Sequence, residues 1–212
     1  MINSQEQSTR GAILQFLKRN AESEMRAIAG FCGLTSMAVR RHVLRLRADG
    51  LVQARTERRP QGRPAGLYSL TELGDAQFPR DYAGLAADLL CALKALDGES
   101  KIREVFQKRR ADLRTRYAGR LRGKGFEARV RETATVLTEC GYMAEVSTSG
   151  PGAYLLTEHN CAIPSVARCF PAACEQQLRF IRGLVGGEVT RVAHLLEGDR
   201  YCSYRIKDRS PR

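Results

Sequence analysis

Residues 36–49 carry the pattern that most restricts how this chain folds. Val39, Val43 and Leu46 recur at intervals of four and three residues, which places them on one face of an α-helix. Thr35 is the predicted N-cap of this helix, and Gly50 is the residue at which the helix is expected to end. Helices are also expected from residue 8 or 9 to about 19 and from 24 to 31. Three helices with a glycine-containing turn before the third are typical of a helix-turn-helix.

Two short strands are expected directly after the third helix, at 51–55 and 67–70. Between them lies a segment rich in arginine, proline and glycine, ERRPQGRPAG at 57–66. Two strands around such a tip predict the wing of a winged helix. His42 leans toward the packed side of the third helix and is interpreted as structural.

Side chains on the outer arc of the third helix and at the wing tip are candidates for DNA contact. Arginine suits phosphates, guanine edges and narrow minor grooves. An ordinary solvated arginine face is the plain alternative. The candidate DNA-binding residues are Ser36, Met37, Arg40, Arg41, Arg45, Arg58, Arg59 and Arg63.

The charge is distributed unevenly along the 212 residues. The formal net charge is +12, and residues 1–80 hold 13 Lys and Arg against 7 Asp and Glu. Residues 131–212 are nearly neutral, with 10 basic and 9 acidic side chains. A basic excess in the first two thirds favours a polyanionic partner such as double-stranded DNA. The N-terminus lacks an apolar signal sequence and no apolar run spans a membrane, so a cytoplasmic protein is expected.

A helical region follows the wing. Residues 82–96 form a leucine-rich helix, and the sequence leaves open whether its leucines make a dimer seam or pack within the chain. A turn at 97–100 precedes a highly charged helix at 101–122. The glycines at 123 and 125 predict a hinge. The expected domains are therefore 8–75 (DNA-binding), 76–123 (linker and dimerisation region) and 124–212 (C-terminal sensor).

The C-terminal third is expected to be a small α+β domain, which makes the whole chain α+β. Helices are predicted at 126–139 and 174–184, with strands at 141–147, 153–157, 188–196 and 201–206. Four of the seven cysteines stand here close together in sequence, at Cys161, Cys169, Cys174 and Cys202. Thiolates suit zinc and iron–sulfur clusters, although the spacing is not that of a zinc finger. Buried apolar cysteines are the plain alternative.

Several segments of this chain resemble the SufR-type regulators of iron–sulfur cluster biogenesis, which carry a DeoR-like winged helix. In the winged helix the similar segments are MAVRRH (37–42), ADGLV (48–52), GRPA (62–65), YSLTELG (68–74) and FPRDY (78–82). In the C-terminal third they are HNC (159–161), Cys174 with its following glutamate, and GDRYCSYRI (198–206).

The resemblance implies a homodimeric repressor that binds a two-fold operator and senses an iron–sulfur cluster, [4Fe–4S] or [2Fe–2S]. It also implies Cys161, Cys174 and Cys202 as ligands. Some members have a further cysteine where this chain has Glu188, so the fourth ligand is open. Glu188, His159, His194, Cys169 or an external thiol are the alternatives.

Other functions remain as alternatives to cluster sensing. The winged helix can serve a zinc or thiol-redox switch, or a domain that binds a small-molecule effector. No glycine-rich phosphate loop and no HExxH motif occurs in the sequence, so an enzyme is not expected. The sequence does not determine the operator, the regulated genes, or whether the form with or without cluster binds DNA more tightly.

Overall fold

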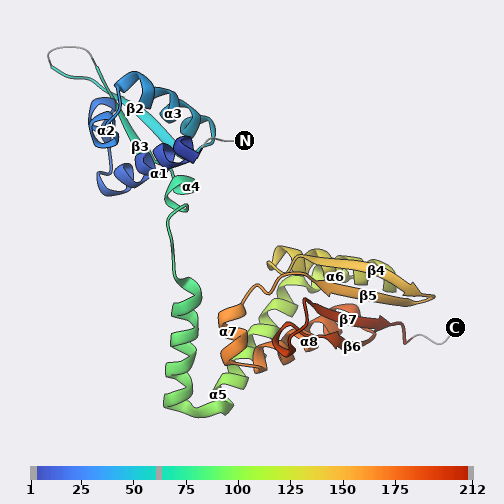
Figure 1. Cartoon of the computed structure of the whole chain (residues 1–212). Coiled ribbons are helices and arrows are strands. Elements are labelled where there is room, and N and C mark those ends of the chain that lie inside the picture. The colour runs from blue at the N-terminus through green and yellow to red at the C-terminus, as the bar shows by residue number, and fades with distance from the viewer. Residues whose placement is uncertain (1–3, 61–63, 210–212) are drawn as a thin grey trace. The chain divides into compact units, whose positions relative to one another are not determined.

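The computed structural model describes residues 4–60 and 64–209 (Figure 1). The chain forms two compact units, the first ending at Arg80 and the second beginning at Asp81. This differs from the predicted division into 8–75, 76–123 and 124–212. Residues 81–123 belong to the same unit as the C-terminal third, because the charged helix also has an apolar face. Ile102 and Phe106 are buried, and Leu113 and Tyr117 pack against the C-terminal core.

The first unit contains four helices and three strands within its described residues. They are α1 (Ser4–Arg19), β1 (Ser23–Glu24), α2 (Met25–Cys32), α3 (Ser36–Ala48), β2 (Val52–Glu57), β3 (Ala65–Leu70) and α4 (Glu72–Asp75). The predicted third helix and wing are confirmed. α1 begins earlier than predicted, so Ser8 and Thr9 lie inside the helix rather than at its cap. β1 was not predicted because two residues carry no alternation pattern.

The helices of this unit pack on one another and on an antiparallel sheet with strand order β1-β3-β2. Ile13, Leu17 and Ile28 pack against Val39 and Val43 in a single core. Gly74 lies in α4, directly after the wing, and packs closely against the backbone of Leu51. A Cβ there would lie 2.0 Å from the Leu51 carbonyl oxygen, so only glycine fits.

The second unit is a mixed helix and sheet fold, as the α+β prediction requires. Its elements are α5 (Tyr82–Leu121), α6 (Phe126–Glu139), β4 (Ala144–Gly150), β5 (Ala153–Glu158), α7 (Pro164–Cys169), α8 (Ala172–Val185), β6 (Glu188–Ala193), the 3₁₀ helix η1 (Leu195–Glu197) and β7 (Cys202–Lys207). Gly98, with φ 77° and ψ 177°, breaks α5 where the sequence predicts a turn.

The strands of the second unit form one antiparallel sheet of order β4-β5-β7-β6. α6 contacts β4, and α8 contacts β6. The second part of α5 packs on α8 (Figure 1). Leu137, Leu156, Ile181 and Ile206 are fully buried in the core between these elements.

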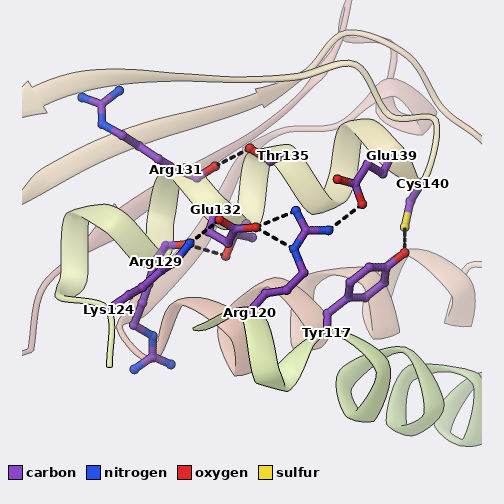
Figure 2. A network of polar contacts seen from close by, with 10 residues as sticks. Tyr117, Arg120, Lys124, Arg129, Arg131, Glu132, Thr135, Glu139 and Cys140 are labelled. Carbon is purple, nitrogen blue, oxygen red and sulfur yellow. Dashed lines mark hydrogen bonds and ion pairs between the residues drawn. The ribbon is translucent and has the colours of Figure 1, made fainter. Parts of the chain in front are cut away.

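Polar contacts tie the end of α5 to α6 across the predicted hinge at 123–125 (Figure 2). Arg120 donates from Nε to Glu132 Oε1 over 2.7 Å and from a terminal nitrogen to Glu139 over 2.6 Å. Lys124 also pairs with Glu132. Gly123 makes the corner with φ 71°, but the ion pairs on both sides of it make a fixed corner rather than a boundary between domains.

Candidate functional site: a winged-helix surface and a cysteine-lined cavity

Helix α3 presents a polar face opposite its buried stripe. Val39, Val43 and Leu46 are 0% exposed, as predicted. Thr35 caps the helix, its hydroxyl accepting from the Ala38 N–H over 3.2 Å. The candidates for DNA contact on this helix are all exposed: Ser36, Met37, Arg40, Arg41 and Arg45. His42 is half-buried, which fits its structural interpretation.

The wing is longer than predicted, with pairs from Val52–Leu70 to Glu57–Ala65. Its base is held by Arg55, which donates to both carboxylate oxygens of Glu22 over 2.7 and 2.5 Å. Arg58 is exposed, whereas Arg59 forms an ion pair with Glu24. A phosphate therefore has to compete with Glu24 for Arg59. Arg63 lies outside the described residues.

Three cysteines from three different elements line a single cavity in the second unit. Cys161 lies in the loop between β5 and α7, Cys174 in the first turn of α8, and Cys202 at the start of β7. The cavity measures about 30 Å³, which is room for a water molecule or two. Its wall is completed by Tyr142, Glu158, Asn160, Ile163, Ala167, Ala173, Gln177, His194 and Tyr204.

Burial disfavours the thiolate forms of Cys174 and Cys202. Burial, together with the neighbouring Cys161 and Cys202, raises the pKa of Cys174 to about 11. Burial also raises the pKa of Cys202, while the Leu195 N–H, 3.5 Å from Cys202 Sγ, opposes that rise. Arg191 lowers the pKa of both thiols. Arg191 and the Leu195 N–H therefore favour the thiolate forms, whereas burial disfavours them.

Glu158 is a buried acid beside the cysteines that the sequence reasoning missed. It is 2% exposed, and burial raises its pKa to about 7. Gln177 donates to Oε1 over 2.9 Å, and the Tyr204 hydroxyl donates to Oε2 over 3.1 Å. A signal was present in the sequence. Tyr154 and Leu156 alternate as inward residues of β5, and Glu158 occupies the next inward position.

The four candidate fourth ligands do not share one location. His194 is 7% exposed and lines the cavity. His159 points to Glu145, which it contacts over 3.1 Å, and its ring packs edge-on against Tyr201. Cys169 is exposed at the end of α7, and Glu188 is exposed at the far end of β6. Within residues 4–60 and 64–209, no three His, Cys, Asp or Glu side chains are grouped so as to hold one metal ion.

One protein-family model matches the chain. The model for winged helix-turn-helix DNA-binding domains covers residues 7–53, which comprise most of α1, all of α2 and α3, and the start of the wing. No curated protein and no solved structure matches the chain. Among the described helices, none is long and apolar enough to cross a membrane. The first unit is a winged helix-turn-helix DNA-binding domain, and the chain is a DNA-binding transcription regulator.

Proposed function

We propose that this regulator senses iron–sulfur cluster status through Cys161, Cys174 and Cys202 and represses genes of iron–sulfur cluster assembly. The observation that carries the proposal is the shared cavity. Three cysteines from a loop, a helix and a strand line it together. His194 and Glu158 line the same cavity, so further donor groups stand beside the three thiols.

The donor set suits a cluster better than a single zinc ion. Each cysteine of a cluster binds a different iron or shares one with a single partner, so the sulfurs stand farther apart than around one ion. Three cysteines from separate elements that line one cavity are compatible with that wider arrangement. Arg191 and the Leu195 N–H supply the positive charge and the hydrogen bond that thiolate ligands need.

The cavity is smaller than a cluster, so loading requires its wall to move. The loop at 159–163 has no regular secondary structure and carries Cys161. Ile163 at its end and Ala173 in α8 line the cavity and also belong to a second apolar cluster around Phe106 and Phe170. Movement of the cavity wall therefore changes the packing of this apolar cluster of side chains.

The same apolar cluster holds the first part of α5. Leu90 and Leu93 pack against it on one side of the helix. On the other side Tyr82, Leu85, Leu89 and Leu96 are between 55% and 83% exposed. The exposed residues follow a spacing of three, four and seven, as the seam of a two-stranded coiled coil does. The packing of Leu90 and Leu93 within the chain leaves the outer face of the helix exposed, and we assign that face to a homodimer.

A homodimer explains how the cavity can control DNA binding. Two winged helices have to stand about one DNA turn apart to contact a two-fold operator. A change at the cavity wall reaches Leu90 and Leu93, and through them the helix that carries the seam. Loading the cysteines then favours one dimer geometry over another, which is what a switch requires.

The test is DNA binding with and without a cluster. Duplexes selected from a random-sequence library by the anaerobically reconstituted protein are expected to share a two-fold motif. Their affinity for the apo protein and for the Cys161→Ser variant is expected to be at least ten-fold weaker. Equal affinity of all three forms would contradict sensing by these cysteines. Retention of a metal response in a colourless, zinc-loaded protein would instead favour the zinc alternative.

A further inference from the structure

His194 lies on the wall of the cavity that the three cysteines line, and a ligand role for it rests on the cluster proposed above. We infer that His194 supplies the fourth ligand through its Nε2 atom. Both common cluster types take four protein ligands, and imidazole replaces cysteine in some of them. His194 is a buried side chain on the cavity wall and is therefore in the place where a fourth donor is needed.

A β-bulge turns His194 toward Cys202. In the pairing of β6 with β7, Arg191 is opposite Tyr204, yet Ala193 is opposite Ser203. The extra residue shifts the register by one, so that continuing it sets His194 opposite Cys202. Without the bulge, His194 would fall on the other face of the sheet. Bulges next to functional sites commonly re-aim a side chain in this way.

The two ring nitrogens of His194 have different partners, and the contact at Nε2 is the longer one. Nδ1 lies 3.1 Å from the carboxylate oxygen Oε1 of Glu197. A carboxylate only accepts, so the ring proton is assigned to Nδ1 and Nε2 is unprotonated. Its contact with a terminal nitrogen of Arg191 is long, at 3.5 Å. A histidine held by a carboxylate on one nitrogen, with the other nitrogen available, is the usual arrangement of a metal ligand.

The backbone around His194 is also fixed. Its N–H donates to the Asp199 carboxylate over 2.7 Å, and its carbonyl accepts from the Glu197 N–H over 2.9 Å. The adjacent Leu195 N–H donates to Cys202 Sγ. One short turn thus positions the imidazole and supports the neighbouring cysteine.

The other acid and base groups are worse placed. Glu158 lines the cavity, but Gln177 and Tyr204 donate to its two carboxylate oxygens over 2.9 and 3.1 Å, which are shorter contacts than the 3.5 Å from Arg191 to His194 Nε2. His159, Cys169 and Glu188 do not line the cavity.

The test is pulsed electron paramagnetic resonance on protein labelled with ¹⁵N only in histidine. Wild type, His194→Ala and the matched control His159→Ala are reconstituted anaerobically with ferrous iron and sulfide and reduced with dithionite. We expect a strong ¹⁵N coupling in wild type and in His159→Ala, and none in His194→Ala. Iron retained by His194→Ala after gel filtration should fall by roughly ten-fold or more. His194→Cys should restore iron retention without the nitrogen coupling.

The outcomes separate this inference from the proposed function. A wild-type protein that takes up a cluster but shows no strong ¹⁵N coupling overturns the histidine ligand and leaves the cluster in place. A wild-type protein that takes up no cluster overturns both. If His194→Ala does not fold, the spectra of wild type and His159→Ala still test the histidine ligand. A ¹⁵N coupling that persists in His159→Ala is then assigned to His194, which lines the cavity of the cysteines.

Discussion

Arg120 and Glu132 meet across the corner between α5 and α6, with Nε of the arginine 2.7 Å from Oε1 of the glutamate. Glu132 also accepts from Lys124 (Figure 2). Lys124 and Arg120 together hold the pKa of Glu132 below its ordinary value. Only 16% of the Glu132 side chain is exposed, so the contact is partly shielded from solvent.

Acid is expected to weaken this corner. A carboxyl group with a lowered pKa in the folded state stabilises the fold above its unfolded pKa of about 4.5, and this contribution is lost as the pH falls through the folded value. Glu132→Gln should lower the free energy of unfolding at pH 7 by about 1 kcal/mol or more. It should also flatten the loss of stability below pH 4.5.

Glu127→Gln is the matched control, because Glu127 lies on the same helix and forms its ion pair with the exposed Arg131 of that helix. Urea unfolding at pH 7 and pH 4 measures both variants. Equal effects of the two substitutions would show that the corner contact contributes no more than an exposed ion pair.

Cys174 is expected to be the slowest of the described cysteines to react in the apo protein. Its pKa of about 11 leaves roughly a hundred-fold less thiolate at pH 8 than an ordinary thiol with a pKa of 9.0. Cys91 and Cys169 are exposed and should react first. Timed alkylation with iodoacetamide followed by peptide mass spectrometry gives the order. Modification of Cys174 as fast as Cys91 would contradict the closed cavity.

The outer face of α5 is expected to hold the dimer together. The double substitution Leu85→Asp and Leu89→Asp places two charges in the exposed stripe without touching Leu90 or Leu93, which pack inward. The variant should be a folded monomer by light scattering and circular dichroism. Met143→Asp, at an exposed residue of the same unit, is the control and should stay dimeric. A double variant that remains dimeric places the interface elsewhere.

The arginines of α3 and the wing are expected to act differently on DNA. Arg58→Ala should weaken binding to all duplexes and reduce the salt slope by about one, as the loss of a phosphate contact does. Arg40→Ala should cost about 1–3 kcal/mol on the selected operator and relax its sequence preference, as the loss of a base contact does. Arg168→Ala, an exposed arginine of the second unit, is the control. Fluorescence anisotropy across a salt series measures all three.

The first unit was largely predictable because its signals are local. The stripe of Val39, Val43 and Leu46 needs only helical periodicity, and the wing needs only its turn residues. α7 (Pro164–Cys169) was missed, because six residues are too few to show a helical period. The hinge at 123–125 was wrong as a boundary, because contacts such as Arg120–Glu132 are invisible in a linear sequence.

The cavity lined by three cysteines was anticipated in part, while their role as ligands stays a prediction. The resemblance named Cys161, Cys174 and Cys202, but it left the fourth ligand open among five alternatives. His194 and Cys202 line the same cavity, and the pairing of β6 with β7 shifts register directly before His194. A register shift of one residue depends on how two distant strands pair, so it cannot be predicted from the local sequence pattern.

The measurement that tests the central claim most directly is the visible absorption spectrum of anaerobically purified protein, with iron and acid-labile sulfide assayed on the same sample. We predict a brown protein that contains iron and sulfide and loses both with Cys161→Ser, Cys174→Ser or Cys202→Ser. A wild-type protein that stays colourless after anaerobic reconstitution with ferrous iron and sulfide would contradict the account, and a thiol or zinc switch on the same winged helix would replace it.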